Sequence, residues 1–291
     1  MTEPRHADPL PLGGGGGLPY SKGLMARALM AAGVSAVRAY ELALRVQDDL
    51  TAAGSDTVDL DRLEELAHEV LGENEGAQAV RRLRRYDALR ELEMPIILLI
   101  GGATGTGKST VATEVAYRLG ITRVSSTDFV RQTMRAFFAP ELMPSIHYSS
   151  FEVPGGVVDG FVDQTQNVLV GIRALIDRAL QEGWSLVLEG VHLVPGMLPP
   201  VEGAMVVHCV LAIEDEQAHE DHFWVRDAHS DGLRPVQKYL DALDDIRLVQ
   251  EFIVDQAVTS GAPVVDNNSI ELAIGTVMEL VLSGAERYVS V

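Results

Sequence analysis

Hydrophobic positions follow two different spacings along the chain. From Leu18 to Leu92 they recur three and four residues apart, as at Leu60, Leu63 and Leu66. That spacing places apolar side chains on one face of an α-helix. We therefore predict that this part of the chain is an all-helical segment of about three or four helices.

A second spacing begins after Pro95, where the run IILLI is continuously apolar. Short runs of this kind are typical of strands buried on both faces of a parallel sheet. Further runs are Ser185 to Leu188, Met205 to Ile213 and Pro263 to Val265, and the helical stretches between them include Gly156 to Leu180 and Leu240 to Ala257. Strands that alternate with helices predict an α/β fold with a doubly wound parallel sheet.

These patterns divide the chain into three parts. Residues 1–17 are rich in Pro and Gly and have little to bury, which predicts a flexible tail. Residues 18–92 are expected to form the small helical segment. Residues 93–291 are expected to form the α/β domain.

Composition favours a globular protein that carries excess negative charge. Hydrophobic residues make up 47% of the chain and charged residues 22%, which suits a protein that buries its own core. The net charge of −19 opposes binding to nucleic acid or anionic lipid, since such binding needs clustered Lys and Arg. We therefore expect neither a nucleic acid nor a membrane as partner. A small anionic molecule would bind where the few basic side chains converge on one cleft.

Cysteine usage and hydropathy indicate a cytoplasmic protein. The single cysteine, Cys209, has no partner for an internal disulfide and lies in the apolar run Met205 to Ile213, which predicts a buried strand thiol. No apolar stretch approaches the ~20 residues of a membrane span. Met1 to Gly17 also lacks the basic start and apolar centre of a secretory signal.

The first predicted strand leads directly into the strongest motif of the sequence. Gly102 to Ser109 matches G-x-x-x-x-G-K-[ST], the phosphate-binding loop, or P-loop. Its glycines let backbone N–H groups turn inward, and the following helix presents its positive end to a nucleotide phosphate. Lys108 would reach the β- and γ-phosphates of ATP, and Ser109 rather than Thr110 would coordinate Mg²⁺. The residues predicted to bind ATP are Gly102, Ala103, Thr104, Gly105, Thr106, Gly107, Lys108, Ser109 and Thr110.

A glycine-rich turn without a ligand is the alternative reading of this motif. It is disfavoured because the pattern, the preceding strand and the following helix all agree. For Gly101 and Gly105, which the motif does not require, simple turn geometry is as good an explanation as a specific role.

A second group of polar residues follows the next expected strand, in SSTDFVRQTMR. Ligands of this fold class bind outside the carboxyl ends of strands, where Asp128 would accept or orient the proton of an attacking hydroxyl. Arg131 and Arg135, one helical turn apart, would hold the anionic groups of a substrate. The alternative for Asp128 is that it only caps a helix beginning at Phe129.

A third group lies in LEGVHLVPG, where a strand again ends in an acid. Glu189 is a candidate for the magnesium site or for orienting the nucleophile. A structural cap is the alternative for this carboxylate. His192 is a candidate substrate contact, and a histidine hydrogen-bonded into the loop explains it equally well.

A fourth group contains basic residues between two helical stretches, where kinases of this architecture place a lid over the phosphates. Arg226, Arg234 and Lys238 would neutralise negative charge in the transition state or bind substrate. A solvated, charged helix end is the alternative.

Together these segments resemble the 2-phosphoglycerate kinase family, P-loop kinases that carry an N-terminal ATP-cone-like helical segment. The resemblance extends from about Pro19 to Asn268. It is carried by PYSKGLMARALMAAG, IGGATGTGKSTVATEVAYRLGI, SSTDFVRQTMR, LEGVHLVPG and RPVQKYLDALDDIRLVQEFIV. The resemblance implies a P-loop NTPase-type sheet and transfer of the ATP γ-phosphate to the 3-hydroxyl of 2-phosphoglycerate, giving 2,3-bisphosphoglycerate and ADP.

Two other functions remain open at this stage. One is a P-loop kinase for a nucleoside, gluconate, shikimate or a sugar amide, although two arginines after Asp128 favour an acceptor with two acidic groups. The few aromatic residues in that segment argue against a stacked base. The other is a non-enzymatic ATP-binding regulator. The oligomeric state is not indicated.

Overall fold

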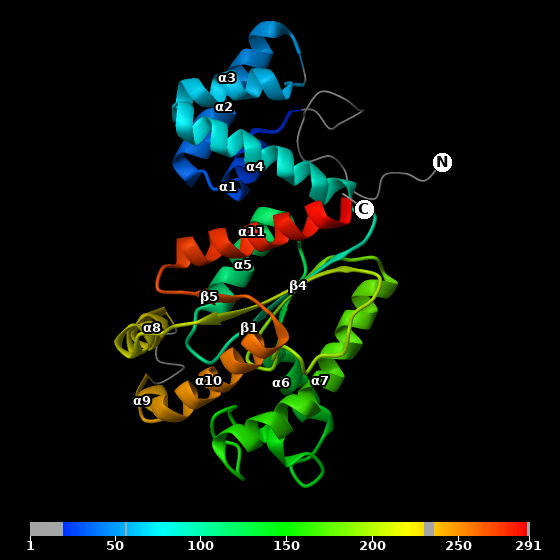
Figure 1. Ribbon diagram of the computed structural model, residues 1–291, viewed down its shortest axis with the longest axis vertical. Coiled ribbons are helices and arrows are strands. Elements are labelled where there is room, and N and C mark those ends of the chain that lie inside the picture. The colour runs from blue at the N-terminus through cyan, green and yellow to red at the C-terminus, as the bar shows by residue number, and fades with distance from the viewer. Residues whose placement is uncertain (1–19, 56, 230–235, 290–291) are drawn as a thin grey trace. The chain divides into compact units, whose positions relative to one another are not determined.

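The computed structural model describes residues 20–55, 57–229 and 236–289 (Figure 1). The chain divides into two compact units, each with its own hydrophobic core. As far as these ranges are described, the helical unit comprises Met1–Glu93, Tyr117–Gly120 and Leu282–Val291, and the sheet unit comprises Met94–Ala116 and Ile121–Val281.

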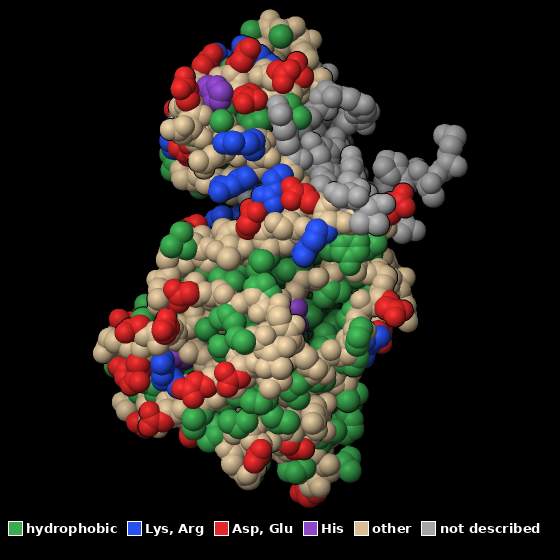
Figure 2. Space-filling model, in the orientation of Figure 1, with side chains coloured by type: hydrophobic (Ala, Val, Ile, Leu, Met, Phe, Trp, Pro, Cys, Tyr) green, Lys and Arg blue, Asp and Glu red, His purple; other side chains and the backbone are tan. Residues whose placement is uncertain are grey.

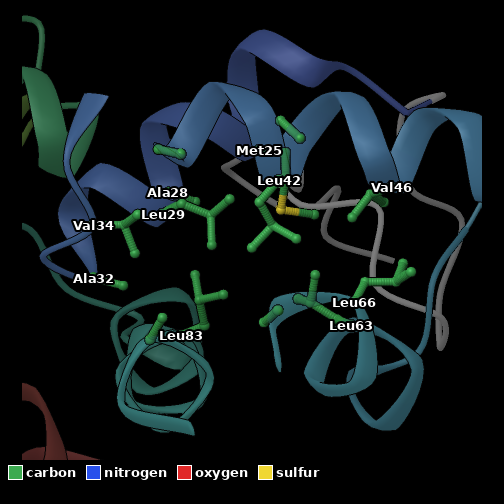
Figure 3. Close-up of a cluster of buried hydrophobic side chains, with 14 of the residues drawn as sticks. Met25, Ala28, Leu29, Ala32, Val34, Leu42, Val46, Leu63, Leu66 and Leu83 are labelled. Carbon is green, nitrogen blue, oxygen red and sulfur yellow. The ribbon is translucent and has the colours of Figure 1, made fainter. Parts of the chain in front are cut away.

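The helical unit begins with α1 (Lys22–Ala31), α2 (Ala36–Ala53), α3 (Leu60–Leu71) and α4 (Glu73–Glu91). Figure 3 shows Leu42 of α2 directed toward Leu63 and Leu66 of α3, and all three side chains are fully buried. Asp59 caps α3 by accepting a 2.7 Å hydrogen bond from the backbone N–H of Arg62. The predicted helical segment is confirmed, because its apolar spacing does form one continuous core.

A sheet of five parallel strands forms the centre of the sheet unit, in the order β2-β3-β1-β4-β5 among the described residues. The strands are β1 (Ile96–Gly101), β2 (Val124–Ser126), β3 (Leu186–Glu189), β4 (Met205–Ala212) and β5 (Val264–Asp266). The central strand β1 is buried along its whole length, as its continuous apolar run predicts. Cys209 is fully buried on β4, so its prediction as a strand thiol is confirmed. The predicted parallel α/β fold is confirmed as well.

Helices cover both faces of this sheet, with α5 and α11 on one side and α6, α7 and α10 on the other (Figure 1). Ile97 and Leu99 of β1 share a buried cluster with Ile172 of α7, and Val210 of β4 shares another with Ile253 of α10. None of the helices in the described ranges is long and apolar enough to cross a membrane. The helices are α5 (Lys108–Leu119), α6 (Thr127–Phe137), the 3₁₀ helix η1 (Pro144–His147), α7 (Val157–Gln181), α8 (Glu216–His229), α9 (Val236–Leu240), α10 (Leu243–Ser260) and α11 (Ile270–Val289).

The register of the sheet brings the ends of three strands together. Ile100 of β1 and Ser126 of β2 are both paired with Glu189 of β3. The segments that follow these three positions therefore leave the sheet at the same edge, which is where ligands of open α/β sheets bind.

Candidate active site

The P-loop joins β1 to α5, and α5 begins at Lys108 inside the motif. The side chain of Lys108 is buried and donates hydrogen bonds to the carbonyl of Ala103 and, at 3.3 Å, to the hydroxyl of Thr106. That hydroxyl in turn donates to the Ala103 carbonyl over 3.0 Å. A fixed ammonium and a helix N-terminus thus lie together, an arrangement that favours a bound phosphate.

A cavity of about 1140 Å³ opens beside the P-loop. Its walls also include the start of α6, the segment 149–151, the loop after β3, residues of α8 and α9, and the start of α11. Of the residues predicted from sequence, it brings together Thr104, Gly105, Gly107, Lys108, Ser109, Thr110, Asp128, Arg131, Glu189 and His192. Gly102, Ala103 and Thr106 are buried in the P-loop and do not line the cavity.

Ser109 and Glu189 line the cavity side by side. The Ser109 hydroxyl donates a hydrogen bond to Oε1 of Glu189 over 2.9 Å. Hydroxyl and carboxylate oxygens are ligands that Mg²⁺ prefers, and such a site normally completes its coordination with water and nucleotide phosphates. No group of three or more His, Cys, Asp or Glu side chains that could hold a metal ion occurs among the described residues.

Asp128 lies in the first turn of α6, but it is not the residue that caps this helix. The cap is Ser126, whose hydroxyl accepts a 3.1 Å hydrogen bond from the backbone N–H of Phe129. The carboxylate of Asp128 instead accepts hydrogen bonds at Oδ1 from Nε and Nη2 of Arg131. The side chain of Asp128 is 59% exposed, so it remains accessible from the cavity.

Arg131 is held on both sides and is 8% exposed. Besides its bonds to Asp128, its Nη1 donates to the carbonyl of Ile146 at 2.9 Å and to that of Tyr148 at 2.8 Å. Four of the five N–H groups of a guanidinium are therefore engaged. Arg131 connects Asp128 to the segment after α6, and one N–H of its Nη2 has no partner among the described residues.

His192 lines the cavity and belongs to a buried polar network. Its Nε2 contacts Oε1 of Gln164 at 2.9 Å, and its Nδ1 contacts the hydroxyl of Thr127 at 2.9 Å. The Gln164 amide nitrogen donates to the carbonyls of Ser145 and Tyr148, so its Oε1 can only accept. His192 therefore carries its proton on Nε2, and Thr127 donates to Nδ1. Burial lowers the pKa of His192 to about 3, which keeps the ring neutral.

Gly190 is the residue that permits this network. A Cβ atom at Gly190 would lie 1.9 Å from the Thr127 hydroxyl oxygen, and the φ angle of Gly190 is +150°. Any side chain there would push Thr127 away from the His192 ring.

The remaining basic candidates lie outside the cavity lining or outside the described side chains. Arg135 donates to Oε1 of Gln132 at 3.1 Å. Lys238 of α9 bonds to Glu152 at 2.9 Å and to the Ser149 hydroxyl at 3.2 Å. Neither basic residue lines the cavity. Arg226 lies in α8 with its side chain outside the described part, and Arg234 lies outside the described residues altogether.

Several polar residues of the site belong to no sequence motif and were not predicted. Gln164 is buried within the apolar face of α7, and a glutamine at a core position is itself a signal of a polar network. His219 and Asn267 are also fully buried, but only the tertiary structure reveals their partners. Ser150 is buried and lines the cavity.

Comparison with curated proteins decides the family. A 2-phosphoglycerate kinase of Pyrococcus horikoshii is 36% identical over 271 residues, covering 90% of this chain and 89% of that protein. The 2-phosphoglycerate kinase of Methanopyrus kandleri is 35% identical over 277 residues, covering 91% and 84%. The chain belongs to the 2-phosphoglycerate kinase family. The resemblance inferred from sequence motifs is thereby confirmed, and the protein is a kinase.

A third member of this family, from Methanothermobacter thermautotrophicus, is 35% identical over 274 residues, covering 90% of this chain and 89% of that protein. Among solved structures, a shikimate kinase from Acinetobacter baumannii has a TM-score of 0.41 and 17% identity, over 67% of this chain and 97% of that one. No protein-family model matches the chain.

Proposed function

We propose that this protein transfers the γ-phosphate of ATP to the free hydroxyl of 2-phosphoglycerate, giving 2,3-bisphosphoglycerate and ADP. The main support is that relatives named 2-phosphoglycerate kinase match about nine-tenths of the chain. The cavity adds a chemical reason, since it joins a P-loop lysine to an exposed carboxylate, Asp128. The lysine suits the phosphoryl donor, ATP, and the carboxylate suits the hydroxyl of the acceptor.

The P-loop is the proposed ATP site. The ammonium of Lys108 is held against the backbone of the loop, where it would neutralise charge on the β- and γ-phosphates of a bound ATP. The N-terminus of α5 adds its partial positive charge at the same place. Positioning and charge neutralisation are the main contributions that a protein makes to phosphoryl transfer.

Ser109 and Glu189 are the proposed holders of Mg²⁺. The Ser109 hydroxyl would be a direct ligand, while Glu189 would accept hydrogen bonds from water in the coordination shell. When bound, the ion neutralises the charge that develops on the phosphate oxygens. The hydrogen bond between the two side chains supports this assignment, because it keeps both oxygens at one point of the cavity.

Asp128 is the proposed acceptor of the hydroxyl proton. Only its Oδ1 is hydrogen-bonded, so among the described residues Oδ2 has no partner and can bind the substrate hydroxyl. Arg131 holds the carboxylate in place and offers its remaining N–H to a substrate anion. Arg135 stays a proposal for a second substrate-anion contact beside Arg131. Arg226, Arg234 and Lys238 stay proposals for neutralising transition-state charge or binding substrate.

An assay of ADP release tests the proposed function. Purified protein with Mg²⁺ and ATP is given 2-phosphoglycerate, 3-phosphoglycerate, glycerate, shikimate, gluconate or uridine, and the product is identified by mass. We expect saturable release with 2-phosphoglycerate and a bisphosphoglycerate product. Turnover on another acceptor, with none on 2-phosphoglycerate, would keep the kinase and reject this substrate.

A further inference from the structure

Helix α8 contacts the P-loop through two histidines, of which His222 also lines the cavity. His219 Nε2 lies 2.8 Å from the carbonyl oxygen of Thr104, and His222 Nδ1 lies 3.1 Å from that of Gly105. A carbonyl oxygen only accepts, so each of these ring nitrogens must carry a proton and donate it. The His219 ring is neutral near pH 7, because burial lowers its pKa to about 4.

Asn267, which follows β5, does the same for the next peptide of the loop. Its Nδ2 donates to the carbonyl of Thr106 over 2.8 Å, and the side chain is fully buried. Three successive carbonyls of the P-loop are therefore hydrogen-bonded to side chains from two other elements, α8 and the segment after β5.

The direction of a carbonyl decides the direction of the adjoining N–H. A trans peptide is planar, with its C=O and its N–H pointing in opposite directions. When the carbonyls of residues 104, 105 and 106 are held toward the three donors, the amides of Gly105, Thr106 and Gly107 point away from them. No described residue accepts a hydrogen bond from these three amides. They are the amides that the motif predicts for phosphate binding.

Gly105 shows how closely α8 approaches the loop. A Cβ atom at this position would lie 2.5 Å from the Phe223 ring and 2.8 Å from Nε2 of His219, and the φ angle is +89°. The His219 and Phe223 rings are stacked, with their centroids 5.3 Å apart and an interplanar angle of 15°. Gly105 is therefore more than a turn residue, because its missing side chain leaves room for the α8 rings.

We propose that His219 and His222 are positioning residues, which together with Asn267 hold three peptide planes of the P-loop so that their amides face a nucleotide phosphate. The proposal deepens the proposed function and rests on it only in taking the P-loop as a nucleotide site. For His219, which is fully buried and does not line the cavity, this role in nucleotide affinity needs no contact with the phosphate.

Equilibrium binding of ADP to the full chain, measured by calorimetry, tests this role. The variants are His219→Leu and His222→Leu, which remove the donors, and His219→Gln, whose amide can still donate. His208→Leu is the matched control, because His208 also contacts a carbonyl, that of Leu193 at 3.2 Å, but lies on β4. We expect each Leu variant of α8 to weaken ADP binding about 5- to 10-fold. His219→Gln should recover most of the affinity, and His208→Leu should bind as wild type.

A purely structural role for the histidines would give a different result. His219→Leu and His222→Leu would then melt at lower temperature, but the folded protein would bind ADP as tightly as wild type, and the proposal would be rejected. If His219→Leu does not fold, the half-buried His222 still decides between the two results. ADP binding needs no acceptor, so a protein that binds ADP in the expected order but ignores 2-phosphoglycerate retains this proposal and loses only the proposed function.

Discussion

The hydroxyl of Ser109 donates a 2.9 Å hydrogen bond to Oε1 of Glu189, which joins the first turn of α5 to the carboxyl end of β3. The two residues are 80 positions apart in the sequence. Glu189 is buried and lines the cavity, so its charge would act strongly on a cation bound at Ser109.

Replacing Glu189 by Gln tests the magnesium assignment. The change keeps a hydrogen-bond acceptor for Ser109 and removes the negative charge. We expect the Mg²⁺ concentration for half-maximal ADP release to rise about 10- to 100-fold. Glu182→Gln, at an exposed ion pair with Arg178 at the end of α7, is the control and should leave this concentration unchanged. An unaltered Mg²⁺ dependence in Glu189→Gln would contradict the assignment.

Lys108→Ala tests the phosphoryl-transfer mechanism. Loss of the ammonium removes charge neutralisation at the transferred group, and we expect kcat to fall by about 100-fold or more. Circular dichroism should show the fold intact. Lys22→Ala, in the helical unit, is the control and should retain wild-type kcat. Unchanged turnover in Lys108→Ala would rule the mechanism out.

Arg131→Met tests the structural connection between Asp128 and the segment after α6. The change leaves the carbonyl of Ile146 without its side-chain donor, and the carbonyl of Tyr148 keeps only the Gln164 amide. A buried unpaired carbonyl is costly. We expect the free energy of unfolding, measured with urea, to fall by about 1–3 kcal/mol. Arg135→Met, one turn further along α6, should change it by less than about 0.5 kcal/mol. Equal effects of the two substitutions would argue against this role of Arg131.

The buried His192 predicts that acid destabilises the fold. Burial, with the nearby charge of Arg131, lowers the pKa of His192 to about 3, whereas the unfolded chain takes up this proton near pH 6.5. The unfolded state therefore binds more protons between these two values. The stability from neutral His192 is fully present above pH 6.5 and is lost as the pH falls toward 3.

Urea unfolding at pH 7 and pH 5 measures this contribution. From pH 7 to pH 5, wild type should lose about 2 kcal/mol more free energy of unfolding than His192→Gln, which has no proton to take up. The comparison uses the change with pH within each protein, so a general destabilisation by the substitution cancels. Parallel losses in the two proteins would show that His192 does not titrate in this way.

Local patterns in the chain were enough to predict the class of fold and to locate the P-loop motif at the end of β1. The apolar run of β1 and the glycines and lysine of the P-loop are consecutive in sequence, so their periodicity and spacing are visible without a structure. Asp128 and Glu189 were also predictable as neighbours, because parallel strands bring their carboxyl ends to one edge.

The tertiary structure alone decided which side chains support these residues. Gln164 reaches His192 across 28 positions, His219 reaches Thr104 across 115, and Asn267 reaches Thr106 across 161. The tertiary structure also decided that Arg131 donates most of its hydrogen bonds to Asp128 and to two backbone carbonyls. Such pairings leave no regular spacing in the sequence. They form where packing buries polar groups, and a buried polar group is hydrogen-bonded to whichever element lies next to it in the fold.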